Sequence, residues 1–266
     1  MLSSCNTTKI FYNYGEIFIS WQVDNYFDLT SEQEEWLKEK SILLLDWHRK
    51  EELPGYKKFL IEIKEIASGG LDMNDLDYSF SIFETKRDRI FEKITPDIAT
   101  FLDSLSVEQI NFLEKKMLED NEELYERMKD KEVILEKRKE NFFEQMETWF
   151  GEISKNQVAR LDELQNQWYK KSSHLSKNRL DLRLKSQNQF ITFLRSKPGK
   201  TSIENWLRQW TFRIVNSSDR KRVNRILRNK KRILEVDKIL THDQRIHAIK
   251  ELDIWIKVIE ETIENY

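Results

Sequence analysis

The chain has few of the residues that interrupt regular structure. Its 266 residues include six glycines and three prolines, too little turn material for the many short strands of an all-β fold or for glycine-rich nucleotide loops. No stretch approaches the ~18 apolar residues of a membrane-spanning helix. Because 39% of the residues are nonetheless hydrophobic, the chain can build a core. We therefore expect an all-α protein, an elongated helical bundle.

The single cysteine, Cys5, excludes an internal disulfide and a thiolate zinc site. It follows Leu2-Ser3-Ser4, an order that resembles a bacterial lipobox, in which the cysteine is lipidated and becomes the mature N-terminus. The resemblance implies a lipid-anchored envelope protein whose signal peptide begins upstream of Met1. Asn6 stands where an aspartate would favour the inner membrane, so we expect the periplasmic face of the outer membrane. The alternative is an accidental cysteine in a cytoplasmic terminus.

Apolar residues recur every three or four positions, a spacing typical of amphipathic helices. After an anchor segment at residues 1–6 we expect an aromatic-rich helical region over residues 7–104, in which Pro54 ends one helix and Pro96 begins a short segment. Residues 105–197 are expected to form a long antiparallel helical hairpin, with a first helix of about forty residues and a turn at Gly151. After a linker at Pro198-Gly199, a basic helical region covers residues 200–266.

Four short motifs share an apolar residue, then Ser or Thr, two further residues and Gln. This is the pattern of a capping box, in which the hydroxyl and the glutamine satisfy free backbone amides at the start of a helix. The first and last motifs read Leu-Thr-x-x-Gln, which resembles the repeated signature of the Spy and CpxP family of helical periplasmic chaperones and stress inhibitors. That weaker resemblance implies chaperone-like activity and allows a homodimer. The predicted N-caps are Thr30, Ser106, Ser154 and Thr241.

A longer pattern occupies the N-terminal third, where aromatic and acidic residues lead into Leu29-Thr30 and a Trp-His-Arg-x-Glu-Glu-Leu-Pro segment follows. Together with the lipobox, it resembles a family of uncharacterised Gram-negative lipoproteins. The resemblance implies location and fold and assigns no reaction. The residues that carry it are Trp21, Asp24, Tyr26, Gln33, Trp36, Trp47, His48, Arg49, Glu51, Glu52 and Pro54.

His48 offers the one candidate for chemistry in this segment. With Glu51 and Glu52 it could place an imidazole and a carboxylate on one helical face, the beginning of a metal or acid–base site. The alternative is a structural network in which these acids and Arg49 pair with the end of the preceding helix, at Asp24 and Asp28. The sequence contains neither a phosphate-binding loop nor a nucleophile elbow. We therefore expect no catalytic residue, no cofactor and no metal.

The charge is unevenly distributed. Between Lys170 and Arg232 there are 19 Lys or Arg residues against three acids, a net charge of +16 in a chain of −2. Either these helices pack beside the acidic ones, or they form a surface for phospholipid or lipopolysaccharide head groups or for acidic polypeptides. No nucleic acid is expected. The candidate anion-binding residues are Arg220, Lys221, Arg222, Arg228, Lys230, Lys231 and Arg232.

These features indicate a lipid-anchored periplasmic protein that binds polypeptides, as a chaperone-like protein or an adaptor. The alternative is a structural or accessory subunit of an envelope assembly complex. An enzyme is a third class, for which the sequence offers no motif.

Overall fold

The computed structural model describes residues 2–172, 175–216 and 220–264, and it describes only the backbone of residues 2–10, 131, 171–172, 175–179, 210–216 and 220–222. The expected all-α fold is confirmed, because the described residues form helices and turns without a strand. The elements are α1 (Leu2–Phe27), α2 (Ser31–Trp47), the π-helical turn η1 (His48–Glu52), α3 (Leu53–Ser68), α4 (Met73–Asp103), α5 (Val107–Lys129), α6 (Lys131–Phe150), α7 (Lys155–Ser172), α8 (Leu175–Arg195), α9 (Lys200–Asn216), α10 (Arg220–Asp237) and α11 (His242–Glu264).

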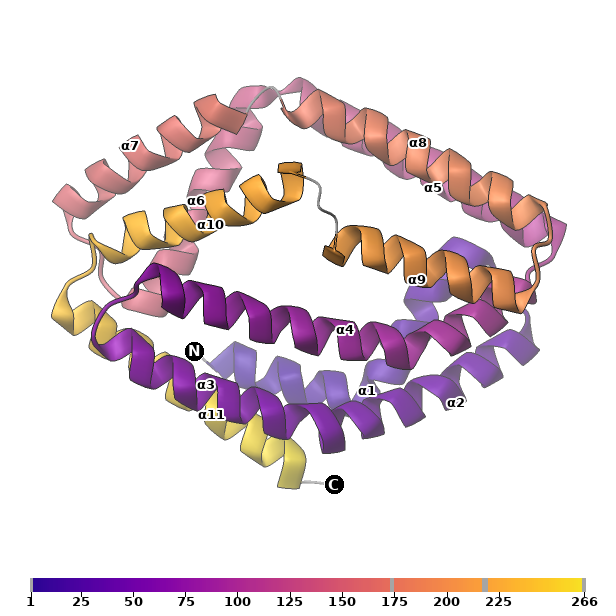
Figure 1. The fold of residues 1–266 in the computed structure, drawn as a ribbon, viewed down its shortest axis with the longest axis horizontal. Helices are drawn as coiled ribbons and strands as arrows, with labels where there is room; N and C mark the ends of the chain where they lie inside the picture. Colours follow the sequence, from indigo (N-terminus) through magenta and orange to yellow (C-terminus); the bar gives the residue numbers. More distant parts are fainter. Residues whose placement is uncertain (1, 173–174, 217–219, 265–266) are drawn as a thin grey trace.

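The helices pack as pairs that join distant parts of the chain. Helix α1 lies against α2, α5 against α8, α4 against α9, and α3 against α11 (Figure 1). The C-terminal helices therefore cover the N-terminal region, and residues 7–104 and 200–266 are built into one body. The two ends of this body, where α4, α5, α8 and α9 meet and where α3, α6, α7, α10 and α11 meet, lie far apart in Figure 1.

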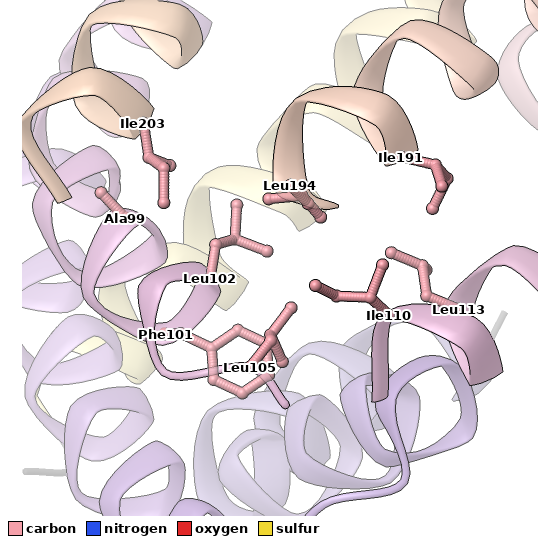
Figure 2. Close-up of a cluster of buried hydrophobic side chains, with 9 residues drawn as sticks. All are labelled: Ala99, Phe101, Leu102, Leu105, Ile110, Leu113, Ile191, Leu194 and Ile203. Carbon is pink, nitrogen blue, oxygen red and sulfur yellow. The ribbon is translucent and has the colours of Figure 1, made fainter. Parts of the chain in front are cut away.

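Each end has its own apolar core. At the first end the buried side chains come from α4, α5, α8, α9 and the turn between α4 and α5, and they point toward one another (Figure 2). They are Ala99, Phe101, Leu102, Leu105, Ile110, Leu113, Ile191, Leu194 and Ile203. At the second end a smaller cluster consists of Met146, Leu161 and Ile239. These two clusters of buried apolar side chains are separate from each other.

The prolines do not end helices as the sequence predicted. Pro54 lies in the first turn of α3, a position that tolerates the missing N–H of proline. The chain passes from α2 through η1 into α3 without a break, and the N–H of Leu53 donates to the carbonyl of His48. Pro96 lies inside α4. The hydroxyl of Thr95 donates to the carbonyl of Phe91, and the buried side chains that follow hold the helix together despite the lost amide donor.

The segment expected to form a hairpin of two long helices consists of four helices, α5 to α8. The expected helix of about forty residues is interrupted at Asp130, which has a non-helical backbone and accepts from the amide of Val133 at 3.0 Å. Asp130 therefore caps α6 and starts a new helix. The turn at Gly151 lies where the sequence predicted it, with a positive φ of 72° that ends α6. Beyond it, α8 returns along α5.

Candidate functional site: a buried polar network at the π-helical turn

The π-helical turn η1 brings charged side chains of the Trp-His-Arg-x-Glu-Glu-Leu-Pro segment into the interior. A π-helical turn places one extra residue in the helix, and such turns are frequent at functional sites. Arg49 and Glu52 are buried, whereas Lys50 and Glu51 are exposed. The turn therefore divides the charges of this segment between the inside and the outside of the molecule.

Glu52 is the centre of this network. Its side chain is completely buried, and its carboxylate accepts from Nζ of Lys86 at 3.3 Å and from Nε of Arg89 at 2.6 Å. Both cations come from α4, so the pair of bonds fastens η1 to that helix. A Cβ at Gly55 would collide with Nζ of Lys86. Glycine at this position therefore allows the ammonium group to reach Glu52.

A second group of contacts fastens η1 to α1. Nδ1 of His48 lies 2.7 Å from the hydroxyl of Tyr12. The guanidinium of Arg49 donates to the backbone carbonyl of Tyr12 at 3.0 Å and lies over its ring at 5.3 Å. Burial raises the pKa of Tyr12 and lowers the pKa of His48. The phenol of Tyr12 therefore stays protonated, and its O–H can donate a hydrogen bond to the neutral imidazole of His48.

The network joins different residues from those that the sequence predicted. Glu52 pairs with α4, and Glu51 faces solvent, whereas the carboxylate of Asp24 accepts from the amide of Leu29 at the end of its own helix. Sequence reasoning missed Tyr12, Lys86 and Arg89, whose signal is weak, because nothing local relates them to Glu52. Among the residues that the structure describes, no group of three His, Cys, Asp or Glu side chains could hold a metal ion. The arrangement can position α1, η1 and α4 against one another.

The lowered pKa of His48 predicts that the protein loses stability as the pH falls. Burial makes the largest contribution to the lowered pKa of His48, the charge of Glu52 opposes it, and the charge of Lys86 adds to it. Tyr12 faces the ring of His48 from α1. The unfolded chain therefore takes up a proton near its ordinary pKa of about 6.5, while the folded chain resists protonation until a lower pH. The contribution of neutral His48 to the free energy of unfolding is therefore complete above the ordinary pKa of histidine and is lost as the pH falls from there through the lower pKa of the folded chain.

The measurement is urea unfolding at about pH 7 and about pH 5, on either side of the ordinary histidine pKa. We expect His48→Gln to have a smaller loss of stability between these two values than the unmodified chain. The exposed His242 provides the control variant, His242→Gln. An equal pH dependence in the His48 variant and the unmodified chain would contradict the assignment.

The four capping boxes that the sequence predicted form two pairs, one at each end of the molecule. At the first end Nε2 of Gln109 donates to Oε1 of Gln33 at 2.6 Å and to the carbonyl of Asp28 at 3.0 Å. At the second end Nε2 of Gln157 donates to Oε1 of Gln244 at 2.7 Å, and Nε2 of Gln244 to the carbonyl of Glu152 at 2.8 Å. Each glutamine also accepts from the amide of its own N-cap residue: Thr30, Ser106, Ser154 and Thr241.

The pairing explains why all four boxes have glutamine at the third position and none has glutamate. A carboxylate can accept from the N-cap amide but has no proton to donate, whereas an amide accepts and donates at once. The use of glutamine in all four motifs was therefore the sign of the pairing in the sequence. The prediction treated the four caps as independent of one another.

The remaining residues of the longer pattern have separate structural roles. The hydroxyl of Tyr26 donates to Asp120 on α5 at 2.7 Å. Trp36 lies nearly parallel to the ring of Phe101 in the first core, with ring centres 6.5 Å apart. Trp47 lies beneath Nζ of Lys93 at 5.5 Å, and Trp21 is exposed on α1. The pattern therefore does not converge on one pocket.

Cys5 and part of the basic cluster fall outside what the structure describes in atomic detail. The backbone of Cys5 lies in α1, and its side chain is outside the described residues, as are the side chains of Arg220, Lys221 and Arg222. The rest of the basic cluster divides. Arg228 and Lys231 are exposed and Arg232 is half-buried, whereas Lys230 is buried, 2.6 Å from Asp77.

The comparisons with known proteins give a family and no activity. No curated protein and no solved structure matches the chain. Within the described residues, no helix is both long enough and apolar enough to pass through a bilayer. Residues 25–209 match DUF6279, a family of unknown function, and this match includes η1, the first capping pair and helices α5 to α8. The chain belongs to the DUF6279 family.

Proposed function

We propose that the protein is a lipid-anchored envelope protein, on the periplasmic face of the outer membrane, that binds polypeptide segments through the outer face of α1. It acts by binding and not by catalysis. The exposed apolar face of α1 carries the proposal.

Helix α1 is apolar on two opposite sides. Ile19, Val23 and Phe27 face α2 and α4, where they line an apolar cavity. On the other side lie large apolar residues that solvent reaches. Their exposed fractions are 41% for Phe11, 59% for Tyr14, 59% for Ile17, 52% for Phe18 and 60% for Trp21.

A helix that is apolar all round is normally covered on all sides. No other helix exposes as many large apolar side chains among the described residues. A contiguous apolar face of this kind typically marks an interaction site. Four of its five side chains are aromatic, and aromatic residues are enriched at protein interfaces. The face therefore supports a role in binding another macromolecule.

The charges of α1 favour a polypeptide over the bilayer as the partner. Helices that lie in a membrane surface are rich in Lys and Arg on their polar face. The sequence of α1 contains Glu16 and Asp24 and a single basic residue, Lys9. Attraction to anionic lipid along this helix is therefore weak.

The position of the face fits an anchored protein. Helix α1 runs from Leu2 to Phe27 without a break. At 1.5 Å per residue, Trp21 lies about 24 Å along the helix from Cys5. An acylated Cys5 would therefore hold the whole face close to the membrane, within reach of polypeptides in the periplasm.

The test places a photo-reactive amino acid at Trp21, with a second protein carrying it at Phe83 as the matched control. Phe83 is 64% exposed but lies on α4. Both proteins are expressed from the full upstream reading frame, and a Cys5→Ala variant tests the anchor by membrane fractionation. We expect adducts with many envelope polypeptides from position 21 only, and release of the Cys5→Ala protein from the membrane.

A purified triple variant, Ile17→Ser, Phe18→Ser and Trp21→Ser, is expected to lose at least about tenfold in suppression of client aggregation, because each buried large apolar side chain contributes ~1.5–3 kcal/mol to binding. Phe83→Ser should retain activity. A single stoichiometric adduct would instead indicate the accessory subunit of an assembly complex. Adducts with lipid alone would contradict the proposal.

A further inference from the structure

An apolar cavity lies at the second end of the molecule, away from the outer face of α1. Its volume is about 480 Å³, and its wall is built from α3, α6, α7, α10 and α11. Phe142, Met146 and Trp149 form one side, and Ile63 and Leu252 lie on others. This volume falls within the range of natural small-molecule sites, which are mostly apolar with a few polar groups that orient the ligand.

Two of the charged residues in the wall neutralise each other. The guanidinium of Arg245 donates to the carboxylate of Asp237, with Nη2 3.1 Å from Oδ2, and to the backbone carbonyl of Asp237 at 2.7 Å. The carboxylate also accepts from the amide of Leu71 at 3.2 Å. This pair is satisfied within the protein and leaves no net charge for a ligand.

The third charged residue of the wall, Arg232, has no such partner. Its guanidinium lies over the ring of Trp168 at 5.2 Å and donates to the carbonyl of Trp168 at 3.4 Å. In the described part of the chain, no carboxylate oxygen lies within 4.0 Å of its nitrogen atoms. Burial, with the nearby charge of Arg228, lowers the pKa of Arg232, and the charge of Glu235, whose carboxylate accepts from Nε1 of Trp168 at 2.7 Å, opposes this shift. A half-buried cation therefore borders an apolar cavity with no described carboxylate at ion-pair distance.

We propose that this cavity binds an anionic single-chain amphiphile of the fatty-acid type, with the acyl chain among the apolar side chains and the acidic head group on Arg232. Two observations support this class of ligand. The lining apart from the charged residues is apolar, which suits a hydrocarbon chain, and the guanidinium at the edge can bind a carboxylate or phosphate through two parallel hydrogen bonds. Arg228, exposed one turn earlier on α10, adds positive charge beside the head group.

The other apolar cavity lacks this combination. It measures about 440 Å³ between α1, α2 and α4. Its Lys40 is already paired with Asp97 at 3.3 Å, and its Lys93 is exposed to solvent over the ring of Trp47. The half-buried guanidinium of Arg232, and not apolar volume alone, distinguishes the two cavities.

The test measures binding to the full, unlipidated chain by calorimetry and native mass spectrometry, below the concentration at which the ligands aggregate. The probes are palmitate, hexadecanol with the same chain and no charge, and lysophosphatidylglycerol. We expect one palmitate per chain and an affinity for hexadecanol at least about tenfold lower, because the alcohol has no charge with which to pair with the guanidinium of Arg232. Arg232-dependent binding of the lysolipid that is tighter than that of palmitate would identify a phospholipid as the source.

Variants localise the site. Arg232→Met should weaken palmitate binding to the level of hexadecanol, and Arg225→Met, on the exposed side of α10, should leave it unchanged. Ala67→Trp should block both ligands by filling the cavity. Equal affinities for palmitate and hexadecanol in the unmodified chain, or an Arg232→Met protein with full palmitate affinity, would overturn the proposal. The α1 variants should bind palmitate normally, so this test and that of polypeptide binding fail independently.

Discussion

Replacing Glu52 by glutamine is expected to lower the free energy of unfolding by about 3 kcal/mol, the lower end of the range for breaking a buried ion pair. The carboxylate is completely buried and accepts from both Lys86 and Arg89. When Glu52 loses its charge, Lys86 remains in a largely buried position, and within the described part of the chain no other carboxylate forms an ion pair with it. Arg89 is half-exposed, with 51% of its side chain accessible, so water can solvate it, and this keeps the expected loss at the lower end.

Glu51 is the matched control for this experiment. It lies in the same π-helical turn and is exposed, so Glu51→Gln should change stability by less than about 0.5 kcal/mol. The measurement is equilibrium urea unfolding at neutral pH, followed by circular dichroism. Similar midpoints for the two variants would contradict the role that we assign to Glu52. Because Glu52 fastens α4 to η1, the Glu52 variant should also expose the part of α4 around Lys86 and Arg89 to proteolysis before the rest of the chain.

Replacing Gln109 by alanine is expected to cost about 2–3 kcal/mol, more than the ~1 kcal/mol of an ordinary N-cap such as Ser106→Ala. The side chain of Gln109 is buried, accepts from the amide of Ser106, and donates to Gln33 and to the carbonyl of Asp28. Alanine removes these bonds together and leaves the carbonyl of Asp28 without this donor.

A double-mutant cycle separates the pairing from the caps. Gln33→Ala and Gln109→Ala should be coupled by at least about 0.5 kcal/mol, as expected for residues in one hydrogen-bond network. Gln33→Ala and Gln157→Ala lie at opposite ends of the molecule and should be additive within about 0.5 kcal/mol. Urea unfolding of the single and double variants provides all the values. Additivity at the first end would show that each glutamine serves only its own helix.

The local features of this fold were predictable, because their causes lie within a few residues. The hydroxyl of Thr30 and the amide of Gln33 are three positions apart, so the capping box is visible in the sequence and present in the structure. The turn at Gly151 has the same origin, since its positive φ favours glycine. The all-α class follows from the spacing of apolar residues and the scarcity of residues that interrupt helices.

The network at η1 could not be predicted, because its partners are distant in the chain. Lys86 and Arg89 follow Glu52 by 34 and 37 positions, and only the packing of α4 beside η1 brings them together. Pro54 and Pro96 misled the prediction for a related reason. Local rules place a helix end at a proline, but a widened turn and a buried core provide compensation that sequence spacing does not show.

The pairing of α3 with α11 determines when the protein can finish folding during its synthesis. Lys64 forms an ion pair with Asp253, 189 positions later in the chain, and Lys57 pairs with Glu260 beside it. While the ribosome adds these intervening residues, the side of α3 that α11 will cover stays open to solvent. The first end of the molecule can form once α9 has emerged, whereas the second end needs nearly the complete chain. A polypeptide built in this way stays partly unfolded until synthesis is almost over, and during that interval it depends on dilution or on a holding chaperone to avoid aggregation.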